Sequence, residues 1–187
     1  MITQYSYGQN ICKSAKNNVI ERFKESCAAE VRADLMNDRS DMVLICENLD
    51  YNINIASAIR ANNAFLNKEV YIAGRKKYDS RGDVGTRHYE NIYHADTIKE
   101  VVEKLHTEGY TVYAVDNVPE YNPQNIWDVD FPTKSAFLMG NEGDGITPES
   151  AALCDGCIYV QQYGSVRSLN VAQCAAVISY EYRRRFH

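Results

Sequence analysis

Hydrophobic residues follow two different spacings along this chain. From Ser14 to Met36 they recur every four positions, which predicts one N-terminal helix with a single apolar face. Beyond residue 40, short apolar runs typical of buried strands alternate with stretches of helical spacing. The predicted strands are 42–46, 69–73, 110–115, 135–139 and 157–160. The predicted helices are 54–66, 97–109, a short one opening at Thr147-Pro148, and one from about Ser168 to Arg185.

Strands that alternate with helices predict an α/β fold, in which helices flank a mostly parallel sheet. We expect an N-terminal helical extension over residues 1–40 and one main domain over 41–187. Local signals support the helix starts, with Asn54 as a capping side chain and a capping box at 97–100. Parallel sheets bind ligands at the carboxyl ends of their strands. The loops after Cys46, Ala73, Val115, Met139 and Val160 are therefore the candidate sites.

Composition limits the class of protein. The 187 residues are 45% hydrophobic, and the longest apolar run is the five residues 42–46, far below the ~20 needed for a membrane span. With no secretory signal at the N-terminus, we expect a cytoplasmic protein whose six cysteines stay reduced. Cys154 and Cys157 form one close pair without a second pair or a matching histidine pair. We therefore interpret them as ordinary buried thiols and predict no metal site.

Charge is unevenly distributed. A net charge of −5 argues against indiscriminate binding of nucleic acid. Residues 75–87 nevertheless carry five cations against two acids, whereas 116–130 carry four acids and no cation. This asymmetry could steer a polyanion to one face, although a solvated loop remains the alternative. The five cations of the basic segment are Arg75, Lys76, Lys77, Arg81 and Arg87.

Three loops carry candidate chemistry. The loop Gly140-Asn141-Glu142-Gly143-Asp144-Gly145 allows close backbone approach to a nucleoside or phosphate, or is simply a tight turn. In the stretch from Asn54 to Arg60, the arginine offers a planar fork for phosphate, with a surface salt bridge as the alternative. Small neighbours of that arginine allow a second element to pack closely. In Arg167-Ser168-Leu169-Asn170 three polar side chains converge at one helix start, where Ser168 could also be a plain cap.

In this order and separation, the three stretches resemble the signature motifs of the SpoU/TrmH family of RNA ribose 2′-O-methyltransferases, in the SPOUT superfamily. The similarity covers about residues 42–185 and looks strongest to enzymes that methylate guanosine 18 of tRNA. It implies S-adenosylmethionine as the methyl donor, a C-terminal trefoil knot that holds this donor, and a homodimer. It also implies RNA as the substrate, with tRNA favoured and ribosomal RNA as the alternative.

The resemblance assigns roles to particular positions. The donor would be held at Gly140, Asn141, Val160 and Leu169. Arg60 would bind a phosphate and stabilise negative charge on the 2′-oxygen, because a guanidinium is a poor base at neutral pH. The other motif positions expected to act in the reaction are Asn54, Glu142, Ser168 and Asn170. Arg167 and the five cations of the basic segment are expected to contact RNA.

Three positions depart from the family pattern. Asn52 and Gln161 stand where prolines are usual, and Ala56 stands where a glycine is usual. Gln161 would loosen a loop that proline fixes, so the departures bear on donor affinity more than on fold. They keep open a catalytically silent RNA-binding relative. A dinucleotide-dependent oxidoreductase is disfavoured, because no glycine-rich turn follows the first predicted strand.

Overall fold

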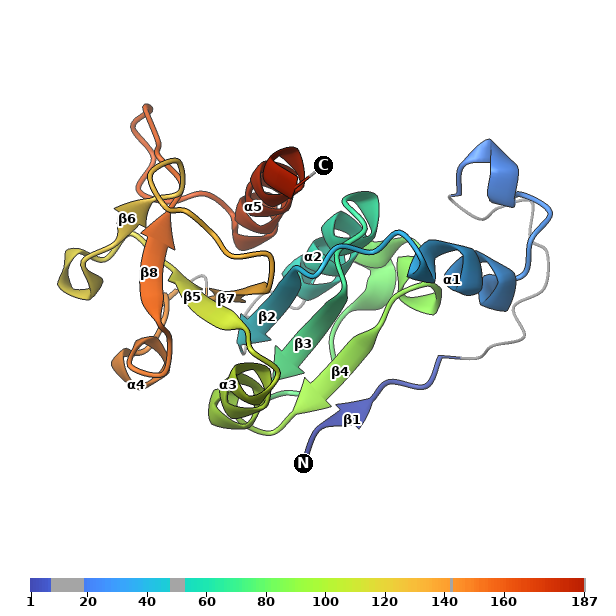
Figure 1. Cartoon of the computed structure of the whole chain (residues 1–187), viewed down its shortest axis with the longest axis horizontal. Helices are drawn as coiled ribbons and strands as arrows, with labels where there is room; N and C mark the ends of the chain where they lie inside the picture. The colour runs from blue at the N-terminus through green and yellow to red at the C-terminus, as the bar shows by residue number, and fades with distance from the viewer. Residues whose placement is uncertain (8–18, 48–52, 142, 187) are drawn as a thin grey trace.

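A computed structural model describes residues 1–7, 19–47, 53–141 and 143–186. They form one eight-stranded sheet in the order β1-β4-β3-β2-β7-β5-β8-β6 (Figure 1). Every neighbouring pair is parallel except β1 with β4, which confirms the predicted α/β fold with a mostly parallel sheet. The strands are β1 (Thr3–Gln4), β2 (Val43–Glu47), β3 (Glu69–Ala73), β4 (Ile92–Ala95), β5 (Thr111–Val115), β6 (Gln124–Asn125), β7 (Ser135–Met139) and β8 (Gly156–Tyr159).

Helices cover both faces of the sheet. α2 and α5 pack on one face and α3 on the other (Figure 1). The alternation of β2 shows the two layers, because Leu44 packs with the α2 and α5 side chains while Val43 and Ile45 pack with those of α3. Across the part of the chain described, no helix has the length and apolarity to cross a bilayer. The α-helices are α1 (Ala28–Met36), α2 (Ile53–Ala64), α3 (Ile98–Thr107), α4 (Pro148–Ala151) and α5 (Val171–Phe186).

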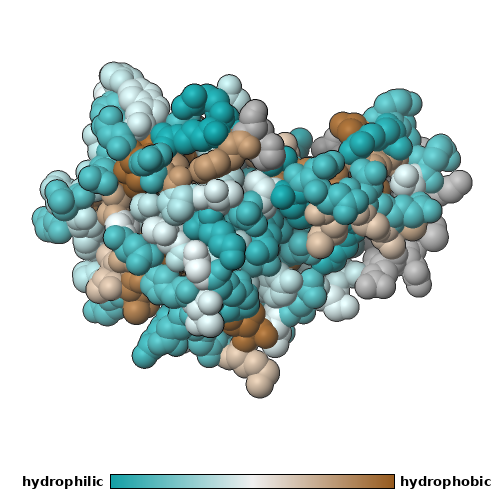
Figure 2. Space-filling model, in the orientation of Figure 1, coloured by the Kyte–Doolittle hydropathy of each residue, from teal (hydrophilic) through white to brown (hydrophobic). Residues whose placement is uncertain are grey.

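All five predicted strands are present, and the four helices predicted after residue 40 are confirmed as α2 to α5. The sequence pattern missed β1, β4 and β6. Two of these have only two residues each, and β4 contains His94, whose ring nitrogen pairs with the Gly74 carbonyl oxygen at 2.8 Å. Hydrophilic residues cover most of the visible surface (Figure 2), as expected when the apolar runs are withdrawn into the sheet.

The predicted single helix from Ser14 to Met36 is wrong in its extent. Residues 14–18 lie outside the described part, residues 21–23 form a 3-10 turn, and α1 begins only at Ala28. Cys27 is extended, and its backbone N–H donates to the Glu30 carboxylate at 2.7 Å, so a capping box starts the helix there. Phe23 is still buried, in a small cluster with α1. The four-residue spacing thus marked buried positions on two elements.

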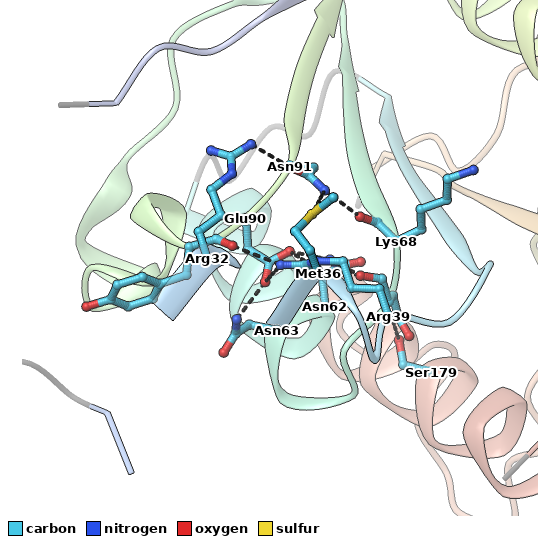
Figure 3. Close-up of polar contacts among 11 residues, drawn as sticks. Arg32, Met36, Arg39, Asn62, Asn63, Lys68, Glu90, Asn91 and Ser179 are labelled. Carbon is cyan, nitrogen blue, oxygen red and sulfur yellow. Dashed lines mark hydrogen bonds and ion pairs between the residues drawn. The ribbon is translucent and has the colours of Figure 1, made fainter. Parts of the chain in front are cut away.

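A buried polar network lies at the amino-end edge of the sheet (Figure 3). Glu90 precedes β4, and its carboxylate oxygen lies 2.9 Å from Arg39 Nη1, with both side chains almost fully buried. The amides of Asn62 and Asn63 at the end of α2 donate to the same carboxylate at 2.7 and 2.6 Å. Burial raises the pKa of Glu90, whereas Arg39 and the two amides lower it. The network ties the segment before β2 to α2 and β4.

Candidate functional site

A cavity of about 440 Å³ opens at the carboxyl ends of β5, β7 and β8. This is the edge where parallel sheets bind ligands, and the volume is ordinary for a small-molecule site. Four segments line it: residues 115–118 after β5, the glycine loop after β7, the end of β8, and the start of α5. We call it the glycine-loop cavity.

The glycine loop folds back on itself and presents its backbone to the cavity. Asn141 and Gly145 exchange two backbone hydrogen bonds of 3.0 and 2.9 Å. A Cβ atom on Gly140 would lie 2.6 Å from the backbone carbon of Gly145, so any side chain there would displace the loop. Gly145 has φ of 72°, a conformation that favours glycine. The glycines are therefore required by the geometry of the turn.

Asp116 fastens the glycine loop to the end of β5. One of its carboxylate oxygens accepts from the Ile146 N–H at 2.8 Å, and the other accepts from the Asn117 N–H at 2.7 Å. The side-chain amide of Asn117 in turn donates to the Arg167 carbonyl oxygen at 3.1 Å. Asp116 and Asn117 thus connect the lining segments, and neither was among the predicted site residues. Their signal was two polar residues directly after a predicted strand.

Two asparagines join the first and third motifs. Asn170 Nδ2 donates to Asn54 Oδ1 at 3.1 Å, although the residues are 116 positions apart. Asn170 Oδ1 accepts from the Ala172 N–H at 2.9 Å and so caps α5. The alternative role of Ser168 as the cap is therefore wrong, and Ser168 is exposed beside the cavity. Asn54 is not a cap either, because α2 begins at Ile53 and Asn54 lies buried in its first turn.

The remaining predicted site residues fall into two groups. Gly140, Asn141, Val160, Leu169 and Arg167 all line the glycine-loop cavity. By contrast, Arg60 is exposed on α2 and is not among the residues lining the cavity, and its side chain makes no hydrogen bond or ion pair with the described residues. Glu142 and Asn52 lie outside the described part of the chain. The predicted close packing beside Arg60 is present, since a Cβ on Gly82 would lie 3.1 Å from the buried Ala56 Cβ.

The cations of the basic segment differ in their surroundings. Arg75, Lys76 and Lys77 are exposed. Arg81 is also exposed but lies 2.5 Å from Asp79, and this contact lowers the pKa of Asp79 to about 2. Arg87 is largely buried, 2.7 Å from the fully buried carboxylate of Asp83. Arg87 therefore stabilises the turn, whereas Arg75, Lys76 and Lys77 are accessible to RNA at the surface.

Of the cysteine pair, Cys157 is buried and Cys154 is partly buried. Burial raises the pKa of Cys154 to about 12 and that of Cys157 to about 11, so both stay protonated at neutral pH. Both are free cysteines.

A larger cavity, of about 730 Å³, lies under α1 near the amino ends of β3 and β4. Its arginines are already engaged, since Arg32 Nη2 donates to Asn91 Oδ1 at 2.5 Å and Arg39 pairs with Glu90 (Figure 3). None of the three motifs reaches it. We therefore place the candidate active site at the glycine-loop cavity.

Comparison with known proteins bears on this site. The tRNA (guanosine(18)-2'-O)-methyltransferase of Escherichia coli is 28% identical over 151 residues, covering 78% of this chain and 64% of the relative. The enzyme of the same name from Thermus thermophilus is 36% identical over 88 residues, covering 47% of this chain and 44% of the relative. The chain thus spans less than two thirds of the length of these relatives.

Solved structures share the fold. The A. aeolicus TrmH/SpoU tRNA modifying enzyme superimposes with a TM-score of 0.74 at 23% identity, covering 84% of this chain and 81% of that one. The SpoU methyltransferase AviRb from Streptomyces viridochromogenes, solved with AdoMet, gives 0.70 at 24% identity, covering 82% and 61%. The SpoU rRNA Methylase family matches residues 41–180, a span that includes all three motifs. The chain therefore belongs to the SpoU methylase family.

Proposed function

We propose that this protein transfers a methyl group from S-adenosylmethionine to a ribose 2′-hydroxyl of RNA. The observation that carries the proposal is the glycine-loop cavity, where the second and third family motifs line one pocket and the first motif hydrogen-bonds to the third. The names of the relatives favour tRNA, and guanosine 18 in particular, as the substrate. Ribosomal RNA is the alternative.

The lining of the cavity fits the donor. An adenosine needs backbone groups at close range. The backbone at Gly140 lies so close to Gly145 and Ile146 that no side chain fits between them. We assign donor contacts to the backbones of Gly140, Val160 and Leu169, with Asn141 beside them. When bound, S-adenosylmethionine supplies a methyl group on a positively charged sulfur. We also propose that residues after β8 pass through the preceding loop as a trefoil knot.

The residues of this chain would position the acceptor and its charge. Arg60, which is exposed on α2, would bind a phosphate next to the acceptor ribose and stabilise negative charge on the 2′-oxygen. Asn54 and Asn170 hold one another and would orient the reacting groups, with Ser168 at the mouth of the cavity. Glu142 would brace the glycine loop. The proton of the 2′-hydroxyl would pass to water or to a neighbouring polar group.

RNA and a second copy of the chain are the proposed partners. Arg75, Lys76, Lys77 and Arg167 are exposed and would contact phosphates of the RNA. Exposed apolar side chains on α5, with Val177 40% and Tyr180 60% exposed, support a homodimer through this helix. A tRNA substrate would place the protein in the cytoplasm.

Methyl transfer from tritium-labelled S-adenosylmethionine to unfractionated tRNA tests the proposal. We expect incorporation of label, and mass-spectrometric mapping should locate it on a ribose 2′-oxygen. Label on a base would contradict the assignment to a ribose 2′-oxygen. In a parallel assay with ribosomal RNA, label on that RNA alone would contradict the tRNA assignment.

Binding of donor and RNA without any transfer would favour the catalytically silent relative. Gln161 is the feature that supports this second candidate. Its amide donates to the Gln162 carbonyl oxygen at 2.8 Å, in a loop where the family usually has proline.

A further inference from the structure

Two large aromatic side chains stand on the surface beside the candidate active site. Trp127 is 59% exposed and Tyr163 is 82% exposed. Their ring centroids are 6.5 Å apart and their planes are inclined by 27°, a stacked arrangement. They come from separate segments, the turn after β6 and the loop between β8 and α5, which rise next to each other in Figure 1. We call them the aromatic pair.

The backbone under Trp127 is held in place. The Ile126 N–H donates to the Tyr159 carbonyl oxygen at 2.9 Å, which extends the pairing of β6 with β8. The Trp127 N–H donates to the Asn125 side chain at 3.2 Å, and Arg185 Nη2 donates to the Ile126 carbonyl oxygen at 2.7 Å. Ile126 itself is buried in the core. The indole is therefore presented to solvent from a fixed turn.

The aromatic pair belongs to segments that adjoin the glycine-loop cavity. Gln162 and Arg167 belong to the same loop as Tyr163, and both line the cavity. Tyr159, which accepts the hydrogen bond from Ile126, lines it as well. A polymer whose reacting group enters the cavity would therefore pass close to the two rings.

We propose that the aromatic pair stacks an unpaired base of the substrate RNA, next to the nucleotide that is methylated. This inference rests on the proposed function and adds a contact to it. Unstacked bases of single-stranded RNA bind aromatic side chains through their π-faces, whatever the base. Arg167, exposed in the same loop, is placed to take a neighbouring phosphate.

Charge favours a base over the other occupants. Residues 116–130 carry four acids and no cation, so phosphates would be repelled there while a neutral base would not. A second copy docked symmetrically on this turn would bring the exposed Asp128 and Asp130 near their own counterparts. The base itself carries no charge, and the exposed Arg167 can bind the phosphate next to it.

The chain contains one tryptophan, so its emission reports on the aromatic pair directly. We expect unfractionated tRNA to quench Trp127 emission, with a midpoint that matches the dissociation constant from filter binding. Tyr163→Ala and Trp127→Ala should each weaken tRNA binding about 5- to 150-fold. The slope of affinity against salt should stay unchanged, because a base contact releases no counterions. Tyr163→Phe and Trp127→Phe, which keep a ring, serve as matched controls and should bind nearly normally.

Three results would overturn the inference: tRNA binding with unchanged Trp127 emission, normal affinity in both alanine variants, or a dimer that dissociates when either ring is removed. Light scattering on each variant measures the last of these. Calorimetry with S-adenosylmethionine separates this inference from the proposed function, because donor binding should survive both alanine substitutions. Loss of the aromatic contact alone would leave methyl transfer detectable at high RNA concentration.

Discussion

The two edges of the sheet use polar residues in opposite ways. At the amino-end edge, Arg39, Asn62 and Asn63 all donate to the carboxylate of the fully buried Glu90. At the carboxyl-end edge, Asp116 and Asn170 hold loops whose backbones face a cavity. A donor that is committed to a buried carboxylate is not available to a ligand. The difference separates residues that stabilise the fold from residues that serve the site.

The largest effect on stability is expected at the amino-end edge. Arg39→Ala would leave Glu90 buried without its ion-pair partner, which should lower the free energy of unfolding by about 3–5 kcal/mol. Lys99→Ala, which removes an exposed pair with Glu103, is the matched control and should cost less than about 1 kcal/mol. Urea denaturation measures both. Equal costs in the two variants would remove the contrast between the edges.

Arg60 tests the other group in the comparison, the residues that serve the site and not the fold. Arg60→Ala should reduce methyl transfer by roughly 100- to 1,000-fold, since it removes a cation proposed to stabilise charge on the 2′-oxygen. Stability and donor affinity should hardly change, because Arg60 is exposed and outside the cavity lining. Single-turnover transfer and calorimetry measure the two quantities. A variant with a near-normal rate would refute the assigned role.

The basic segment should contribute to RNA affinity through phosphates. Replacing Arg75, Lys76 and Lys77 together with alanine should weaken tRNA binding and reduce the slope of log affinity against log salt by about 2–3. The matched control removes three cations elsewhere, at Lys99, Lys104 and Lys134. If affinity and slope both stay at their original values, the basic segment is not the RNA contact.

The smallest effect is expected at the end of α5. Glu181 lies 2.8 Å from both Arg184 and Arg185. The two arginines lower the pKa of its carboxyl to about 2, and Arg184 has the larger effect. The ionised carboxylate thus stabilises the fold above its ordinary pKa near 4.5, and this contribution is lost as pH falls from about 4.5 to 2.

Glu181→Gln should therefore cost about 1–3 kcal/mol near neutral pH, because the carboxylate is buried and accepts from two arginines, and the difference from the native protein should vanish by about pH 2. Glu103→Gln, in the exposed pair with Lys99, is the matched control. A cost in Glu181→Gln that persists unchanged at pH 2 would contradict the pairing.

Elements whose signals are local were predictable. The runs 42–46 and 135–139 became strands because each is apolar on both faces, as the centre of a parallel sheet requires. Thr97 caps α3 through its side chain, and Thr147 does the same for α4. In each case the residues that determine the element are its own neighbours in sequence.

Features that depend on distant residues were not predictable. Glu90 and Asn91 make the start of β4 look polar, and their partners Arg39 and Arg32 lie more than 50 positions away. Asp116 binds a loop 30 residues later, so its place after a predicted strand indicates a candidate site but not which segment it holds. The motifs predicted which loops meet at the cavity, whereas the side chains that hold those loops together emerged only from the fold.

Calorimetric titration with S-adenosylmethionine tests the central claim most directly. The protein should bind the donor, and Gly140→Ala should weaken that binding at least tenfold, because a Cβ there would meet the glycine loop at 2.6 Å. Gly164→Ala, where a Cβ would meet nothing within 4 Å, should bind normally. Absence of binding in the native protein, or equal affinity in the two variants, would contradict the assignment of the glycine-loop cavity as the donor site.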